Sequence, residues 1–272
     1  MGLRKGWLAG LALIAISPLG MPASRAAAEP VTLLYTVQAM GMTVMEVQVA
    51  MDLTDAGYGV EFRSRLRGMA VAFGSGQQVT RVTGTWSGDA ARPIRYDAEG
   101  VWRGEPRRTL VEWPGGQPAI RAMVPPNDAE REEVPEALRR GTVDTLSAVA
   151  QLVRQVQRTG RCDSTARIFD GRRLTEMAAR TEGQEAISGG RGEWSGQALR
   201  CRFDGRLVSG FRRNDNGEEA RRPQTGHAWM GAARPGGPVV PVRIESPSRW
   251  FGTLTVRLAE VQSPVRPAAA QR

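Results

Sequence analysis

The stretch MEVQVAMDLTDAGYGVEFRSRL, residues 45–66, decides the fold. Apolar residues occupy every second position from Met45 to Leu53 and again from Tyr58 to Phe62, and a short turn at 55–57 separates the two runs. Side chains along a β-strand point alternately to opposite sides. Each run therefore predicts a strand with one buried side and one side in water, which is typical of an antiparallel sheet.

Similar alternating runs extend this pattern in both directions along the chain. They cover residues 31–38, 79–87, 93–103, 107–113, 166–169, 173–180, 194–203 and 250–258. Short turn sequences such as Gly88-Asp89 and Asp170-Gly171 lie between neighbouring runs. Because short connections join strands that are neighbours in space, successive strands are predicted to pair as a meander.

Residues 142–158 predict the principal helix. Leu146, Val149 and Val153 recur at helical spacing on one side, while Thr142 is placed to cap the start and Gly160 to end the helix. A single amphipathic helix among strands must lay its apolar side on a sheet. The predicted fold class is mainly β, an antiparallel meander sheet packed on one principal α-helix.

Residues 1–28 have the three parts of a secretory signal peptide. Arg4 and Lys5 precede an apolar run at 7–16, and a small-residue site ends at Ala28. The run is shorter than the ~20 apolar residues that span a bilayer, although an uncleaved anchor is the alternative interpretation. No later stretch is apolar enough to span, so the exported chain is expected to be soluble, with a single domain at 29–262 and a disordered tail at 263–272.

The charge of the chain argues against a nucleic-acid partner. The net charge of +9 falls to about +6 when the three basic residues of the signal region are removed, and Lys5 is the only lysine. The arginines do not cluster into a basic stripe of the kind that nucleic-acid binders carry. The strand arginines Arg63, Arg65 and Arg67 and the acidic stretch at 128–136 instead suggest contacts with proteins.

The two cysteines, Cys162 and Cys201, predict one disulfide. In an oxidising compartment such a pair is bridged more often than free. A bridge would fasten the end of the helix to a strand. The alternatives are two separate thiols, or a zinc site completed by His227, which lacks the short ligand spacing that zinc sites show.

None of the remaining motifs predicts catalysis. Asp144 and Ser147 at the helix start are explained by capping. Asp170-Gly-Arg-Arg173 predicts a turn, with an anion site as the alternative, and the glycine-rich loop at 188–192 lacks the Lys-Ser/Thr of a phosphate loop. We therefore expect neither an enzyme nor a cofactor or metal.

Four segments together resemble a known family. They are Gly141-Thr-Val-Asp-Thr-Leu-Ser147, Cys162, Ile168-Phe-Asp-Gly-Arg-Arg173 and the Trp194…Gly196…Cys201 stretch. They are similar to the exported bacterial proteins grouped as domain of unknown function 3108, over residues 30–262. The resemblance implies a periplasmic location and a curved antiparallel sheet, or incomplete barrel, around the helix, and it implies no activity.

A curved sheet with one helix can leave an apolar pocket between them. The expected function is to bind or carry an apolar or lipid-like ligand in the cell envelope, and the alternative is an envelope structural or assembly factor that contacts other proteins. The candidate pocket residues are Leu146, Val149, Val153, Phe62, Leu66 and Trp194.

Overall fold

The computed structural model describes residues 30–73, 76–190, 192–215, 217–248 and 252–262. The predicted signal peptide at 1–28, the predicted tail at 263–272 and Trp250 lie outside the described residues. The strands of the first half are β1 Val31–Ala39, β2 Met42–Leu53, β3 Gly57–Leu66, β4 Gly76–Ser87, β5 Ala90–Trp102, β6 Glu105–Glu112 and β7 Ala119–Val124. Those of the second half are β8 Ser164–Phe169, β9 Leu174–Ile187, β10 Gly196–Ser209, β11 Gln224–Ala232, β12 Val239–Ser248 and β13 Gly252–Gln262.

Helical segments are few and mostly short. The α-helices are α1 Glu136–Arg139, α2 Thr145–Thr159 and α3 Gly217–Arg221. The 3₁₀ turns are η1 Gly68–Phe73, η2 Pro114–Gly116 and η3 Asn127–Ala129. Among the described residues α2 is the one long helix, so the prediction of a mainly β protein with one principal helix is confirmed.

All thirteen strands belong to one antiparallel sheet. Its order is β7-β6-β5-β4-β3-β2-β1-β13-β12-β11-β10-β9-β8. Each half is a meander, and β1 joins the halves because it pairs with β2 on one side and β13 on the other. The predicted meander is therefore confirmed, and β7 and β8 are its two ends.

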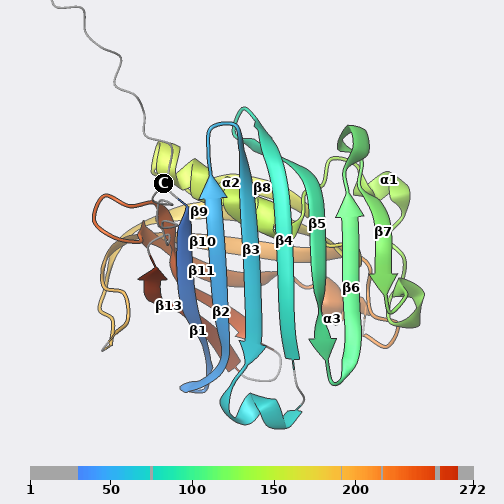
Figure 1. The fold of residues 1–272 in the computed structure, drawn as a ribbon, viewed down its shortest axis with the longest axis horizontal. Helices are drawn as coiled ribbons and strands as arrows, with labels where there is room; N and C mark the ends of the chain where they lie inside the picture. Colours follow the sequence, from blue (N-terminus) through green and yellow to red (C-terminus); the bar gives the residue numbers. More distant parts are fainter. Residues whose placement is uncertain (1–29, 74–75, 191, 216, 249–251, 263–272) are drawn as a thin grey trace, which may run out of the picture.

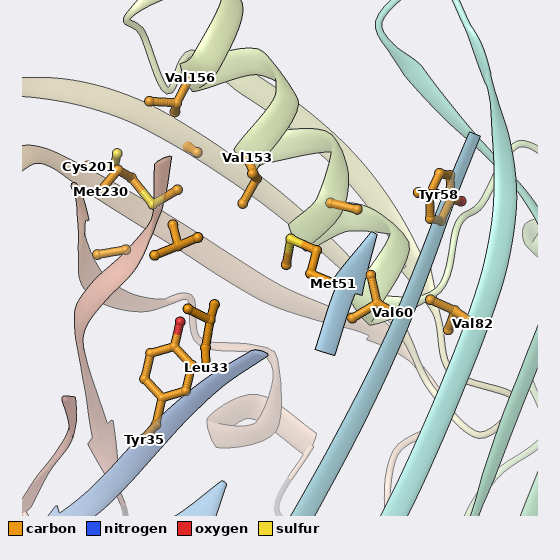
Figure 2. Packing of buried hydrophobic residues seen from close by; sticks show 14 of the residues in the cluster. Leu33, Tyr35, Met51, Tyr58, Val60, Val82, Val153, Val156, Cys201 and Met230 are labelled. Atoms are coloured by element: carbon orange, nitrogen blue, oxygen red, sulfur yellow. The ribbon is translucent and has the colours of Figure 1, made fainter. Parts of the chain in front are cut away.

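The sheet curves so that its two halves face each other across α2 (Figure 1). The helix contacts β3, β4 and β5 of the first half and β8 and β12 of the second. Val153 and Val156 point from the helix into the space between the halves, toward Met51 and Val60 on one side and Met230 on the other (Figure 2). The apolar side of α2 thus packs against strands that are far apart in the sequence.

The core follows the alternation that the sequence shows. Along β1 every second residue is buried, and Leu33 is fully buried. Val60 and Val82 continue the buried layer on β3 and β4, and Leu258 does so on β13. Each such side chain contributes about 1.5–3 kcal/mol by leaving water, so the alternating runs provide the main stabilisation of the fold.

The start of α2 differs from the prediction in its capping residue. Asp144 is the N-cap, and its carboxylate accepts a hydrogen bond from the Ser147 backbone N–H at 2.9 Å. Thr142, the predicted cap, lies two residues earlier and donates its hydroxyl to the carbonyl of Arg139. Gly160 ends the helix in the left-handed conformation with φ 66°, as predicted.

The gap between the two ends of the sheet is bridged by polar contacts. The β8–β9 turn reaches β7, where the guanidinium of Arg172 donates to the carbonyls of Val124 (3.0 Å) and Pro125 (2.8 Å). Arg172 also lies 3.9 Å from Glu130 in the segment that follows β7, and Glu130 is paired with Arg107 of β6. We call this closure the seam; because it replaces a strand-to-strand ladder, the sheet is an incomplete barrel.

Replacing Arg172 with alanine is expected to destabilise the protein by about 2 kcal/mol, because a mostly buried guanidinium leaves two carbonyls without donors. Urea unfolding followed by circular dichroism measures this. Arg121→Ala on β7 is the control, since Arg121 is exposed and pairs with Glu112 alone; we expect a change of about 0.5 kcal/mol or less. Equal effects of the two substitutions would show that the seam adds no stability.

Candidate functional site

A cleft of about 1090 Å³ lies at the end of the molecule where α2 begins. Its walls come from the start of β5, the corner between β6 and η2, the entry into α2, and strands β8 to β10. Most of the lining is uncharged. The apolar residues of its wall are Ala90, Ala91, Pro93, Ile94, Trp113, Val143, Ala166, Met177, Ala178 and Pro223.

Three hydrogen-bonded contacts hold the cleft together. The indole N–H of Trp113 donates to the carbonyl of Thr142 at 3.1 Å, and the backbone N–H of Ala91 donates to Oε1 of Gln151 at 2.8 Å. Val143 forms a parallel bridge with β8, because its N–H donates to the carbonyl of Arg167 at 2.9 Å. These contacts fix the helix and both halves of the sheet around the cleft.

Two side-chain nitrogen donors of the lining have no partner among the described residues. Because Oε1 of Gln151 already accepts from Ala91, its amide nitrogen Nε2 is the end left to donate into the cleft. Arg92 lines the cleft, is exposed, and forms no ion pair with a described residue. Both are donors, so they suit a ligand with a carbonyl or an anionic group.

The other charged residues of the lining are already partnered. Arg206 pairs with Glu176 at 2.8 Å, and Arg167 donates to the carbonyls of Arg140 and Leu138 at 3.0 and 2.9 Å. Asp204 accepts from Arg202. These contacts engage the other charged residues, which leaves Arg92 and Gln151 as nitrogen donors that a ligand can reach, beside the hydroxyls of Thr85 and Thr165.

A buried hydrogen-bonded chain lies under the start of α2. Tyr58 donates its hydroxyl to Ser147 at 2.7 Å, and the Ser147 hydroxyl donates to the Asp144 carboxylate. Burial raises the pKa of Asp144 from 3.8 to about 6, even though the hydrogen bonds from Ser147 act in the opposite direction. Asp144 and Ser147 are fully buried, so the chain supports the helix start and has no access to a substrate.

The sequence matches the model of the family described as protein of unknown function (DUF3108) over residues 33–259, which is most of the chain. The chain belongs to the DUF3108 family. Among solved structures, the DUF3108 chain is similar to the crystal structure of a β-barrel-like protein of domain of unknown function DUF1849 from Brucella abortus. The TM-score is 0.50 and the identity 10%, and the match covers 86% of this chain and 97% of that one. Identity this low shows a shared fold alone. No curated protein matches the sequence.

The DUF3108 structure places the candidate pocket residues mainly in the packed core. Val153 is fully buried, and Leu146, Val149, Phe62 and Trp194 pack against the buried cluster. None of these five borders any of the three cavities described for the structure. Leu66 does: it lines a second cavity of about 270 Å³ at the opposite end of β5 from the cleft.

The two cysteines of the DUF3108 domain form the predicted disulfide. Cys162 follows the end of α2 and Cys201 lies on β10, with 5.9 Å between their Cα atoms, and both are buried. The bridge fastens the helix end to the second half of the sheet. Because the thiols are joined, the zinc alternative with His227 is not available; His227 lies on β11, 3.5 Å from Glu182. No group of three or more potential ligands suited to a metal occurs among the described residues.

The remaining motifs of this DUF3108 chain have structural roles. The Asp170 carboxylate accepts from the backbone N–H groups of Arg172 and Arg173 at 2.9 and 2.8 Å, so the predicted turn is confirmed, and both arginines also line the second cavity. No helix among the described residues has the length and apolar character needed to cross a membrane.

Proposed function

We propose that the protein is an exported, periplasmic binding or carrier module that holds a lipid-like ligand in the cleft, and that it acts by binding rather than by catalysis. The single observation that carries the proposal is the cleft of about 1090 Å³ with its apolar wall. Sites for small molecules are concave, mostly apolar and about 300–1,000 Å³ in volume. A cleft of this size suits a ligand with an extended apolar part.

The polar groups define the other end of the ligand. Gln151 Nε2 and the Arg92 guanidinium can both donate to an oxygen, while the other charged residues of the lining are engaged. Trp113, Met177 and Val143 supply apolar contacts. The chemistry favours an amphiphile with a carboxylate, phosphate or ester carbonyl at one end and an apolar chain at the other.

The alternative, an assembly factor that binds proteins through its charged strands, has less support in the contacts. Arg65 and Arg67 both pair with Glu46, at 2.7 and 3.0 Å, and Arg63 pairs with Glu61 at 2.5 Å. Glu130 of the acidic stretch pairs with Arg107. These charges are satisfied within the chain, so they offer little to a partner. Glu132, Glu133 and Glu136 of the acidic stretch are exposed and form no ion pair with a described residue, so they are what remains in support of this alternative.

Native mass spectrometry of gently purified protein is expected to show a bound amphiphile, and a panel of fatty acids and phospholipids is expected to raise the melting temperature.

Arg92→Gln is expected to weaken binding about tenfold, because it removes a charge-assisted hydrogen bond. Gln151→Glu is expected to weaken binding of an anionic ligand at least as much. It keeps an oxygen for the Ala91 N–H but replaces the free donor with a negative charge.

Arg108→Gln is the matched control for charge. Arg108 is an exposed arginine of the first half that pairs weakly with Asp97 at 3.5 Å and does not line the cleft. It should leave affinity unchanged. Protein that is free of ligand and shows no thermal shift with any member of the panel would exclude the proposal, and capture of a stoichiometric periplasmic protein would then favour the alternative.

A further inference from the structure

We propose that the end of the molecule opposite the cleft docks on the surface of a lipid bilayer. This end is formed by the β1–β2 turn, by η1 between β3 and β4, and by the β5–β6 turn, which lie along one edge of the first half of the sheet (Figure 1). We call it the rim and define it by Met40, Met42, Val71, Trp102 and Arg103. The proposal is independent of the cleft, which lies at the other end of β5.

The rim gathers most of the exposed large apolar side chains of the described residues. Met40 is 68% exposed, Val71 52%, Met42 46% and Trp102 43%. The other three such residues in the described ranges, Ile94, Val124 and Leu138, lie outside the rim. Antiparallel topology brings the four together, because β1, β3 and β5 all end at the same edge of the sheet. Clustered exposed apolar side chains mark interaction sites, whereas single ones do not.

The backbone of the rim gives a second, independent observation. Met40 (φ 49°) and Arg103 (φ 54°) are the only non-glycine residues with positive φ among the described residues, and both lie at rim turns. Each precedes a glycine that also has positive φ, which is the pattern of a tight hairpin turn. Such turns favour asparagine, aspartate or glycine at the first position, so methionine and arginine there are strained choices. We infer that the side chains themselves are needed at the tips.

The form of the rim fits a bilayer better than a folded partner. The apolar side chains of the cluster come from three neighbouring turns, and a lipid interface accepts such side chains without matching their shape. The Arg103 guanidinium lies 5.9 Å from the Trp102 ring and forms no ion pair with a described residue. A tryptophan beside a free cation suits the headgroup level of a membrane, where the ring enters the apolar region and the charge stays among phosphates.

The second cavity shares this end of the molecule. Trp102, Leu66 and Met45 line it together with the buried Tyr96. Charged residues such as Arg107 and Arg172 line it as well, so its lining is mixed and the docking proposal does not depend on it.

Co-sedimentation of the full exported chain with vesicles tests the proposal. We expect the wild-type protein to bind vesicles that contain equal amounts of phosphatidylcholine and phosphatidylglycerol. The variant Met40→Ser/Met42→Ser/Val71→Ser/Trp102→Ser is expected to bind at least about tenfold less, because four partly exposed apolar side chains lose their transfer into lipid. These positions are exposed, so the melting temperature should stay near that of the wild type.

The matched control is Val124→Ser/Leu138→Ser, which removes two exposed apolar side chains outside both the rim and the cleft and should bind like the wild type. A second measurement does not depend on the variant with four substitutions. Brominated phosphatidylcholine in the vesicles should quench tryptophan fluorescence of the wild type, and Trp102→Phe should lose most of that quenching. Absence of wild-type binding, or equal binding by the rim variant and the wild type, would overturn the proposal.

Discussion

Replacing Cys162 and Cys201 together with alanine is expected to lower the free energy of unfolding by about 4 kcal/mol, the largest single effect we predict. The two residues are 39 positions apart, so the bridge closes a loop that contains β8, β9 and the start of β10. Without the bond, the unfolded chain has a higher conformational entropy, because that loop is no longer closed. Urea unfolding of the double variant, compared with the oxidised wild type, measures the loss.

Two controls distinguish the effect of the covalent bond on stability from the effect of packing the two sulfur atoms. The wild type, unfolded and refolded in a reductant, keeps both sulfurs but loses the bond, and it should show most of the loss. Trp194→Phe changes a partly buried side chain that packs against the same core without touching the bridge, and it should cost less. If the reduced wild type were as stable as the oxidised protein, the bridge would not be what holds the helix end to β10.

The alternating strands and the disulfide could be predicted from the sequence because each depends on a local pattern or on a rare residue type. β11 and β12 gave no such pattern. In β11 the residues from Ala228 to Gly231 are all buried, so the strand does not alternate. β12 contains Pro241, which suggests a break, but this proline sits where the pairing with β11 shifts at Trp229 and Met230. A proline is tolerated in a sheet at such an irregularity.

The cleft could not be predicted because its parts come from separate regions of the sequence. Gln151 lies on the side of the helix that the spacing predicts to be exposed, yet it accepts a hydrogen bond from Ala91, 60 positions earlier. Arg154 on the same side is mostly buried and lies 4.7 Å from the ring of Trp86. A helix enclosed by both halves of a sheet buries part of its polar side, which hydrophobic spacing alone does not reveal. Five of the six candidate pocket residues instead pack in or against the core, and Leu66 lines the second cavity.

Replacing Asp144 with asparagine is expected to make the protein more stable than the wild type at pH 7, while the two are similar near pH 4. Burial raises the pKa of Asp144 to about 6, above its value of 3.8 in the unfolded chain. Between these values the folded protein binds more protons than the unfolded chain. The contribution of Asp144 to stability is therefore present below about pH 4 and is lost as the pH rises to about 6, by roughly 3 kcal/mol in total.

Asparagine retains an oxygen to accept from the Ser147 N–H, so the cap remains while the ionisation is removed. Urea unfolding at several pH values between 4 and 7, taken as the difference between variant and wild type, isolates Asp144 from all other groups. Asp163→Asn is the control of opposite sign. The hydrogen bond from Thr181 lowers the pKa of Asp163, so that variant should lose stability relative to the wild type as the pH rises through the unfolded-chain value of 3.8, a change that is measured by extending the series below pH 4. A difference between Asp144→Asn and wild type that stays constant across this range would mean that Asp144 ionises as freely in the folded protein as in the unfolded chain, and that burial does not raise its pKa.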